Sequence, residues 1–335
     1  MIRFLAVILS LLVCLSPVIA RQTSAVPGLL KSLAGRDDLK SLKAIIVAQD
    51  GEVVAEEGYR GHRPSESTNI KSASKSIVSA LVGIAIDKGL LTGPEQKIAP
   101  ILNSDLPSPA DPRIGDITIG NLLSMQAGLG RLSGPNYGRW VSSRNWVRFA
   151  LAQPFDAEPG GRMLYSTAST HLLSAILTKV GGKSTLALAR EWLGPVDGFR
   201  IDAWSRDPQG IYLGGNEMAM TARSLLAFGE LYRNRGRTED GRQVIPDNWI
   251  DLSWQAHTNS RFSGDAYGYG WFTRQIGGED VHFAWGYGGQ MLYIVPDLKL
   301  TVVMTSEQDG PSARTGYRDA LHGVLADIID TLEAD

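Results

Sequence analysis

Apolar residues are spaced in different ways along this chain, and each spacing predicts a kind of element. Residues 77–86 are apolar or small at nearly every position, which predicts a helix buried on all sides. Lys88 and Gly89 then supply a basic last turn and a glycine that end this helix. Residues 321–332 instead repeat their apolar positions with a period of about 3.6, which predicts an amphipathic helix near the C-terminus.

Short β-rich runs predict strands near both ends of the chain. Residues 42–57 contain two such runs around Asp50-Gly51, a pair that favours a type I′ hairpin turn. Residues 291–295 and 298–305 form a second predicted hairpin, joined by Pro296-Asp297. Helical patterns fill most of the remainder: a short helix within residues 21–42, then helices over 118–125, 144–152, 172–180, 185–192 and 218–233, with a surface loop over 128–138.

The order of these elements predicts an α/β (α+β) fold. An antiparallel sheet would be built from both chain ends and flanked by helices, with an inserted, mostly helical subdomain. We expect residues 21–335 to form a single domain. Its α/β part would comprise about residues 21–70 and 205–335, and its helical subdomain about residues 71–204.

Composition and charge add limits to this prediction. The chain has 335 residues, of which 43% are hydrophobic and 20% charged, and this is ample for a globular core. A formal net charge of −2 offers no electrostatic argument for binding nucleic acid or an anionic membrane. The expected partner is therefore a small molecule, and the oligomeric state stays open.

Residues 1–20 have the composition of a secretory signal segment. Arg3 precedes an apolar run over residues 4–15, which is too short to span a bilayer as a helix. We expect a periplasmic or secreted protein, cleaved near Ala20 and without a stable membrane span in its mature form. Cys14, the only cysteine, would be removed with this segment; lipidation at Cys14 is disfavoured because the residue before it is not small.

Two polar side chains open the buried helix and suggest a chemistry. Ser72 and Lys75 are three residues apart, so a helix places them one above the other on one face. Desolvation of a lysine there should lower its pKa or require a dedicated partner. A lysine amine can then take the proton of a serine hydroxyl and make it a nucleophile. Alone, Ser-x-x-Lys is a weak motif, because Ser72 could equally cap the helix and Lys75 lie in solvent.

Two further segments strengthen this interpretation. Tyr165-Ser-Thr167 precedes a predicted helix, and residues 284–290, Ala-Trp-Gly-Tyr-Gly-Gly-Gln, precede a predicted strand hairpin. Together with Ser72-Ala-Ser-Lys75, and in this order, they resemble the β-lactamase/penicillin-recognising serine hydrolase superfamily. The likeness is greatest to its class C-like branch, which includes esterases, D-amino-acid peptidases and 6-aminohexanoate-dimer hydrolase. The likeness extends over most of residues 40–310 and includes the local sequences of residues 118–128, 214–221 and 267–271.

The resemblance implies a role for each matching residue. Ser72 would be the nucleophile, Lys75 its proton acceptor, and Tyr165 a second base or acid facing the serine and the leaving group. The oxyanion hole would be the backbone N–H groups of Ser72 and Tyr287. Whether Lys75 or Tyr165 takes the first proton stays open, because coupled groups share their titration. A lysine ammonium beside Tyr165 should also lower the pKa of this phenol.

Two departures from the family pattern bear on the substrate. The family's Tyr-x-Asn is here Tyr165-x-Thr167, so a hydroxyl replaces the amide that contacts substrate and lysine. Its Lys-Thr-Gly is here Ala284-Trp285-Gly286, which removes a charge-assisted contact of about 1.5–3 kcal/mol to a substrate carboxylate. Arg131 or Arg139 could compensate, but the sequence places neither. We therefore favour an esterase or amidase whose substrate needs no free carboxylate.

The remaining candidates concern substrate contacts and other chemistries. Neither a metal nor a cofactor is expected, because the five histidines lack metal-ligand spacing, and His282 is more readily explained as structural. The chain lacks a Gly-x-Ser-x-Gly elbow, which argues against an α/β-hydrolase. A β-lactamase or DD-peptidase, and a catalytically silent binding or sensor protein with the same fold, are the alternatives. Substrate-binding candidates are Thr167, Trp285, Gly286, Tyr137 and Trp140; the last two and Trp285 could form an apolar pocket wall or belong to the core.

Overall fold

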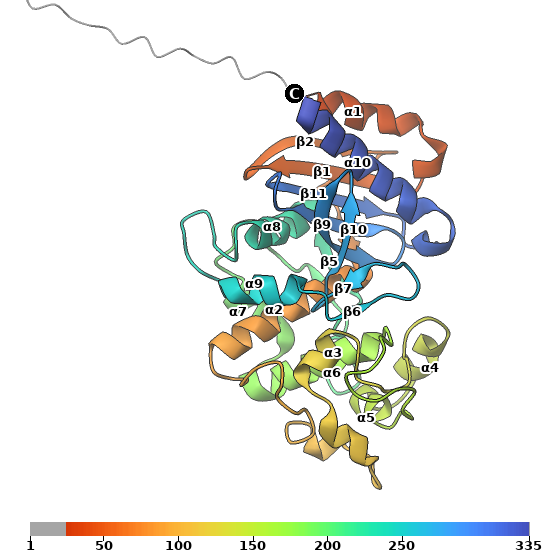
Figure 1. The fold of residues 1–335 in the computed structure, drawn as a ribbon, viewed down its shortest axis with the longest axis vertical. Helices are drawn as coiled ribbons and strands as arrows, with labels where there is room; N and C mark the ends of the chain where they lie inside the picture. Colours follow the sequence, from red (N-terminus) through yellow and green to blue (C-terminus); the bar gives the residue numbers. More distant parts are fainter. Residues whose placement is uncertain (1–24, 335) are drawn as a thin grey trace, which may run out of the picture.

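Figure 1 shows a computed structural model of the protein, which describes residues 25–334. The predicted signal segment, residues 1–20, lies outside the described residues. The strands are β1 (Leu42–Gln49), β2 (Glu52–Gly58), β3 (Ser67–Asn69), β4 (Ala203–Trp204), β5 (Met218–Thr221), β6 (Thr258–Asn259), β7 (Ala266–Tyr267), β8 (Phe272–Ile276), β9 (Glu279–Gly286), β10 (Gln290–Val295) and β11 (Leu300–Ser306). The helices are α1 (Val26–Ser32), α2 (Ser74–Asp87), α3 (Ile119–Leu123), α4 (Tyr137–Val141), α5 (Trp146–Leu151), α6 (Thr167–Gly181), α7 (Thr185–Trp192), α8 (Ala222–Arg233), α9 (Asp247–Trp254) and α10 (Tyr317–Ala334).

One large antiparallel sheet joins the two ends of the chain. Its strand order is β2-β1-β11-β10-β9-β8-β7-β6, so the N-terminal and C-terminal hairpins meet where β1 pairs with β11. Ile45 lies opposite Met304 in that pair. The first hairpin turns at Asp50 and Gly51, both with positive φ as a type I′ turn requires. The predicted fold class, a sheet built from both chain ends, is confirmed.

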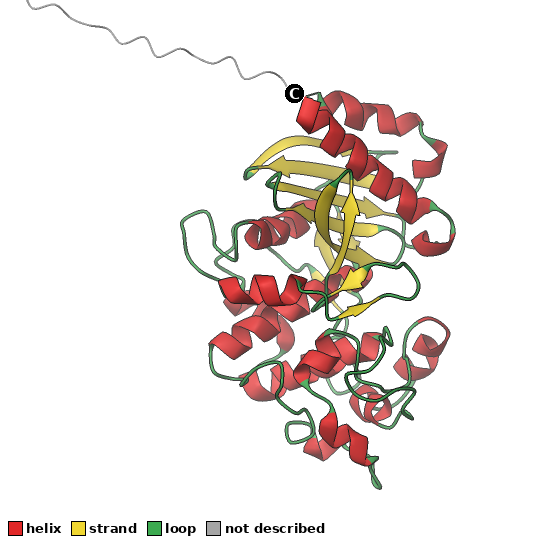
Figure 2. Ribbon diagram, in the orientation of Figure 1, coloured by secondary structure: helices red, strands yellow, loops and turns green. Residues whose placement is uncertain are grey.

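Helices cover both faces of this sheet, which explains why β1 is apolar at almost every position. Ile45 and Val47 belong to a core shared with α1 and α10. Ile46 and Ala48 point to the opposite face and belong to the core that includes α8. A strand buried on both faces needs apolar side chains on both sets of alternating positions. Figure 2 shows the sheet between these two groups of helices, with α1 and α10 on its outer side.

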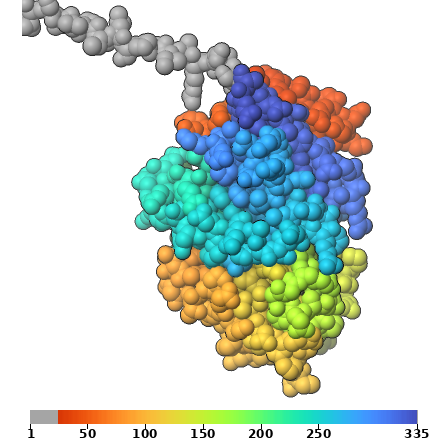
Figure 3. All heavy atoms as spheres, in the orientation of Figure 1, coloured from red at the N-terminus to blue at the C-terminus, as the bar shows by residue number. Residues whose placement is uncertain are grey.

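The inserted chain between β3 and β4 packs around α2. Helix α2 is buried from Ser74 to Ala85 and contacts α6, α7, α9 and β9. It ends at Asp87, and Gly89 after it has a φ of 69°, as the C-terminal stop signal predicts. In Figure 3 the residues of this insertion form the lower part of the molecule, below the C-terminal half of the chain. None of the helices within residues 25–334 combines the length and apolarity needed to cross a membrane.

Some predicted boundaries are wrong, for local reasons. Residues 218–221, predicted as the start of a helix, form strand β5 because they pair with β3. Thr221 then caps α8 by accepting a hydrogen bond from the Ser224 N–H (3.0 Å). Thr118 caps α3 as predicted, but α3 ends at Leu123 rather than near Met125. Helix α9 was not predicted from the sequence pattern.

Candidate active site

The start of α2 brings Ser72 and Lys75 into direct contact. Ser72 lies in a 3₁₀ turn, Lys71–Ala73, that leads into the helix. Lys75 follows one turn later and is 2% exposed. Its Nζ donates to Ser72 Oγ over 2.8 Å, as the three-residue spacing predicts. A hydroxyl and an amine are therefore within proton-transfer distance of each other at the N-terminal end of a buried helix.

Burial decides the protonation of this lysine. Desolvation lowers the pKa of Lys75 from 10.5 to about 7, and no charged group among the described residues contributes to this shift. A second hydrogen bond from Nζ goes to the backbone carbonyl of Gly215 over 2.7 Å. The expectation of a lowered pKa is confirmed, and the physical cause is the loss of water around the ammonium. Near neutral pH a large fraction of this side chain is the free amine, which can accept a proton.

Tyr165 enters the site from the loop that precedes α6. The Lys75 Nζ lies 5.0 Å from the centroid of the Tyr165 ring, and the Ser72 side chain is close enough to the Tyr165 phenol to lower its pKa. Tyr165, which is distant in the sequence from Ser72 and Lys75, thus shares one site with them. The ring packs edge-on to Tyr267 and stacks on Phe272, which holds its orientation.

The predicted lowering of the Tyr165 pKa is wrong. Burial raises the pKa of Tyr165 to about 12, against smaller lowering effects from the nearby Ser72 side chain and the Arg131 charge. Desolvation of the phenolate outweighs the neighbouring groups, and Lys75 has already lost its proton at the pH where this phenol titrates. Tyr165 is therefore a neutral phenol over the ordinary pH range and is suited to donate a proton.

A segment that the sequence argument did not assign to the site completes it from the other side. Gly215 supplies the carbonyl that binds Lys75, and its φ of 83° suits glycine. A Cβ at this position would lie 2.8 Å from Lys75 Cγ, so only glycine allows this approach. Asn216 follows, and its Nδ2 donates to the Tyr137 hydroxyl over 2.9 Å. In the sequence, the two adjacent glycines at positions 214 and 215 were the feature that could have indicated this close approach.

The next residue, Glu217, ties this segment to the turn that carries Ser72. It accepts from Lys71 Nζ over 3.3 Å and from Asn69 Nδ2 over 2.7 Å. Asn69 Oδ1 also accepts the Lys71 N–H over 2.9 Å. Lys71 and Glu217 both have positive φ (52° each), a strained conformation for residues with a Cβ. The network stabilises the bend immediately before the candidate nucleophile and the bend after Gly215.

The third motif lies at the end of β9, against the same turn. A Cβ on Gly286 would lie 2.2 Å from the carbonyl oxygen of Ile70, so glycine permits β9 to reach the Ser72 turn. Tyr287, the next residue, is 50% exposed. The assignment of the Tyr287 and Ser72 backbone N–H groups as the oxyanion hole stays a prediction. Trp285 is half-buried and donates from Nε1 to Ser312 Oγ over 3.0 Å.

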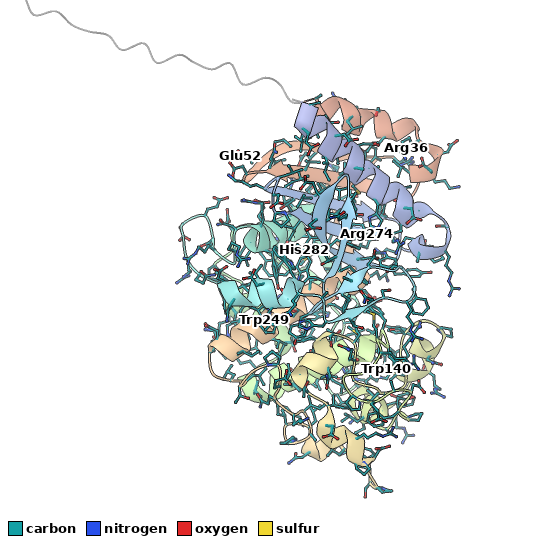
Figure 4. The ribbon with its side chains drawn as sticks, in the orientation of Figure 1. Arg36, Glu52, Trp140, Trp249, Arg274 and His282 are labelled. Carbon is teal, nitrogen blue, oxygen red and sulfur yellow. The ribbon has the colours of Figure 1, made fainter. Side chains whose placement is uncertain are left out.

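The other predicted substrate contacts differ in position. Thr167 is buried, and its hydroxyl hydrogen-bonds with Ser133 Oγ (2.9 Å) rather than with Lys75. Trp140 is fully buried and donates to the backbone carbonyl of Trp146, so it belongs to the core and offers no wall to a ligand. Figure 4 shows Trp140 among the helices of the insertion. Tyr137 is half-buried and reaches the Asn216 side chain.

Competing residues are accounted for by structural contacts. The hydroxyls of Ser74 and Ser76 donate to the backbone carbonyls of Lys71 and Gly270, so both are committed inside the fold. His282, labelled in Figure 4, stacks on Trp254 with ring centroids 4.1 Å apart. Burial lowers its pKa to about 4, which fits a structural histidine. Within residues 25–334 no group of His, Cys, Asp or Glu side chains could hold a metal ion.

A small hollow opens beside the site. It has a volume of about 90 Å³, and Tyr165 forms part of its wall. Arg131 also lines it, so one of the two arginines considered from the sequence is near the site. The other, Arg139, lies over the Phe149 ring and donates to Gln153 Oε1, away from the hollow.

Comparison with known proteins gives a family match and several related sequences. A family model described as "Beta-lactamase" matches residues 40–326. The 6-aminohexanoate-dimer hydrolase of Paenarthrobacter ureafaciens is 25% identical over 317 residues, which cover 87% of this chain and 79% of that protein. A probable fimbrial assembly protein FimD, serogroup H1, of Dichelobacter nodosus is 33% identical over 144 residues, 41% of this chain but only 36% of that relative's length.

The fold has a close counterpart among solved structures. A putative 6-aminohexanoate-dimer hydrolase from Bacillus anthracis superposes with a TM-score of 0.72 and 21% sequence identity. The match covers 90% of this chain and 81% of that one. At this identity the likeness concerns the fold alone.

Proposed function

The chain belongs to the beta-lactamase family, and on this basis we propose that it is an exported serine hydrolase that cleaves an ester or amide through an acyl-enzyme on Ser72. The observation that carries the proposal is the contact of 2.8 Å between Lys75 Nζ and Ser72 Oγ, with the pKa of Lys75 lowered to about 7 by burial. A free amine at this distance can accept the hydroxyl proton as the serine attacks.

The first half of the reaction forms the acyl-enzyme. Ser72 Oγ attacks the carbonyl carbon while its proton passes to Lys75 Nζ. The backbone N–H groups of Ser72 and Tyr287 would bind the oxyanion of the tetrahedral intermediate. When this intermediate collapses, the bond to the leaving group breaks, and Tyr165 donates its proton to that group. Lys75 then returns the proton to Tyr165, so both residues regain their starting states.

The second half reverses these roles with water as the nucleophile. Water attacks the acyl carbonyl, gives a proton to the same base, and Ser72 Oγ leaves with a proton as the acid is released. The pKa values support Lys75 over Tyr165 as the first base, because the phenol is a neutral donor below about pH 12. The substrate, water and the side chains of Ser72, Lys75 and Tyr165 supply all the atoms and protons that these reaction steps need.

A substrate panel tests the proposal against its alternatives. We expect the wild type to hydrolyse p-nitrophenyl butyrate or a matched anilide faster than nitrocefin, because Ala284 replaces the motif cation that meets a β-lactam carboxylate. Strong nitrocefin turnover without esterase or amidase activity would instead indicate a β-lactamase or DD-peptidase. The absence of turnover and of a fluorophosphonate adduct would indicate a silent binding or sensor protein.

Two serine variants locate the nucleophile. Ser72→Ala should abolish both turnover and the fluorophosphonate adduct, while peptide mapping of the wild type should place the adduct on Ser72. Ser76→Ala is the matched control, because its hydroxyl is one turn away but donates to the Gly270 carbonyl. If Ser76→Ala loses the adduct and Ser72→Ala retains it, the assignment of the nucleophile is wrong.

The export part of the proposal has a separate test. It rests on the composition of residues 1–20, which lie outside the described residues. Expression of the full chain in a bacterial host, followed by fractionation and N-terminal sequencing, should give a mature protein that begins close to residue 21. A full-length product retained in the cytoplasm would contradict it.

A further inference from the structure

Four polar side chains packed against helix α2 or within it are buried without a hydrogen-bond partner. They are Ser79 in α2, Tyr232 in α8, Trp249 in α9 and Trp271 just before β8. Three of them are fully buried, and Trp249, labelled in Figure 4, is 4% exposed. Their two hydroxyls and two indole N–H groups form no hydrogen bond with any atom of residues 25–334. A buried polar group without a partner costs stability, so each of the four calls for an explanation.

These side chains come from segments that meet on one face of α2. Gly83 lies one turn after Ser79 on the same face of the helix, and a Cβ at Gly83 would lie 2.4 Å from the Trp249 ring. A Cβ at Gly270, the residue before Trp271, would lie 3.2 Å from the Ser79 Cβ. Helix α9 and the chain before β8 therefore both pack closely on α2 around Ser79.

The Tyr232 hydroxyl is the group that the other three approach. The rings of Tyr232 and Trp271 lie 4.6 Å apart, centroid to centroid. Burial raises the pKa of Tyr232 to about 12. The side chains of Trp271, Ser79 and Trp249 lie close enough to the hydroxyl to oppose this rise in pKa. Ser253 has the same effect, but its hydroxyl already donates to a backbone carbonyl over 2.9 Å. The four unpartnered groups thus gather around one point.

The chemistry of these groups matches a water molecule. An indole N–H can only donate, whereas a hydroxyl can donate or accept. One water accepts two hydrogen bonds and donates two, so it can give each of the four groups a partner. An anion fits less well, because no charged group among the described residues contributes to the pKa shift of Tyr232. An anion at this point would therefore be buried without a compensating cation, at a large cost.

We propose that these four side chains together bind one ordered water molecule, which is a permanent part of the fold. The water accepts hydrogen bonds from the two indole N–H groups and donates to the Ser79 and Tyr232 hydroxyls. It joins α2 to α8, α9 and the chain before β8, none of which is adjacent to α2 in the sequence.

This water site lies directly behind the turn of α2 that carries Lys75. A Cβ at Gly270 would lie 3.0 Å from the Lys75 carbonyl oxygen, and the Ser76 hydroxyl donates to the Gly270 carbonyl over 2.7 Å. The water therefore holds the chain that packs against the first turns of the helix. The inference does not rest on the proposed function, because it concerns how α2 is held and not what Ser72 attacks.

A high-resolution crystal structure of the wild type tests the site directly. We expect an ordered water whose oxygen lies about 2.7–3.2 Å from the four polar atoms. A second crystal, grown in sodium bromide, separates water from an anion, because bromide scatters anomalously. A bromide peak at this point, or a direct hydrogen bond between Tyr232 and Ser79 with no water between them, would overturn the proposal.

The sign of a change in stability provides a second test. Tyr232→Phe removes the hydroxyl and keeps the ring, so the variant should fold. If the hydroxyl binds the water, its loss should lower Tm by roughly 2–4 °C. A hydroxyl with no partner would have the opposite effect, because its removal would relieve a desolvation cost. An unchanged or raised Tm would therefore contradict the proposal. Tyr59→Phe is the matched control, since this buried hydroxyl donates directly to the Leu30 carbonyl over 2.8 Å and its loss should lower Tm by a similar amount.

A double-mutant cycle tests whether the groups share one partner. Ser79→Ala and Tyr232→Phe should together lower Tm by less than the sum of their separate effects, because either substitution already weakens the binding of the water. Ser79→Ala combined with Tyr59→Phe should be additive, because these residues belong to opposite sides of the sheet. Additive losses in both pairs would show that Ser79 and Tyr232 have no common partner, and the proposal would be wrong.

Discussion

The protonation state of Lys75 gives the sharpest test of the site. Moving the pKa of a lysine from 10.5 to about 7 corresponds to roughly 5 kcal/mol against the charged form, at about 1.36 kcal/mol per pKa unit. The side chain is 2% exposed, so solvent screening reduces this figure little. The amine must be unprotonated to accept the Ser72 proton. We therefore expect kcat/KM to rise tenfold per pH unit below about pH 7 and to level off above it.

The assay follows p-nitrophenyl butyrate from pH 5 to pH 9 at the isosbestic wavelength of p-nitrophenol, so that the product's own ionisation does not distort the rates. At pH 5, two units below the pKa of Lys75, kcat/KM should be about 100-fold below its plateau. If the Tyr165 phenolate were the first base, the rate would instead keep rising toward its pKa of about 12. A profile that is flat between pH 5 and 9, or that shows no plateau, would refute Lys75 as the base.

The same pKa shift predicts a pH dependence of stability that needs no substrate. Between about pH 7 and 10.5 the unfolded chain keeps a proton on Lys75 that the folded chain has lost. The unfolded state binds more protons, so the free energy of unfolding rises with pH there, by up to about 1.4 kcal/mol per unit, and this term is flat below pH 7. Urea unfolding from pH 6 to 10 should show this slope in the wild type and lose it in Lys75→Met. Lys40→Met, at an exposed position, should keep it.

Three further substitutions test how the site and its supporting helix are packed. Gly215→Ala should lower kcat/KM on the order of 100-fold by displacing Lys75. Gly210→Ala, with a similar φ of 86° and open space around its Cβ, should leave kcat/KM unchanged. If both variants lose kcat/KM equally, backbone strain alone is responsible. Glu217→Ala should release the Lys71 turn and lower kcat/KM about 10-fold, through loss of interactions worth about 1–3 kcal/mol, while Glu52→Gln on the surface should have no effect. Gly83→Ala in α2 should reduce the free energy of unfolding by about 1–3 kcal/mol, because its Cβ would lie 2.4 Å from the Trp249 ring. Gly323→Ala in α10, where the Cβ meets open space, should instead raise the free energy of unfolding by about 0.5–1 kcal/mol. If urea unfolding shows a gain for both variants, α2 and α9 are less tightly packed than the structure indicates.

The local geometry of the site was predictable because it depends on short-range regularities. Three-residue spacing brings Ser72 and Lys75 together in any fold in which the helical turn at residues 71–73 continues into α2. An all-apolar helix must be buried, and burial lowers the pKa of a lysine at its start. The turn at Asp50 and Gly51 and the cap at Thr118 follow from the same kind of local rule.

Other features depend on which distant segments meet, and no spacing in the chain encodes that. Residues 218–221 have a helical pattern, but a strand partner at β3 was available only in the folded molecule. Trp140 could have lined a pocket or a core, and its neighbours Trp146 and His171 determined the outcome. The carbonyl of Gly215 and the Lys71–Glu217 pair each join residues about 140 positions or more apart.

The sequence by itself therefore determined the antiparallel sheet from both chain ends, the buried helix, and the serine–lysine pair at its start. Only the tertiary structure decided the direction of the Tyr165 pKa shift, because desolvation there outweighs the nearby charges and keeps the phenol protonated. It also decided that Arg131 lines the hollow beside Tyr165 while Arg139 lies over the Phe149 ring. The physical reason is that local conformation follows from neighbouring residues, whereas burial and long-range charge depend on packing between segments far apart in the chain.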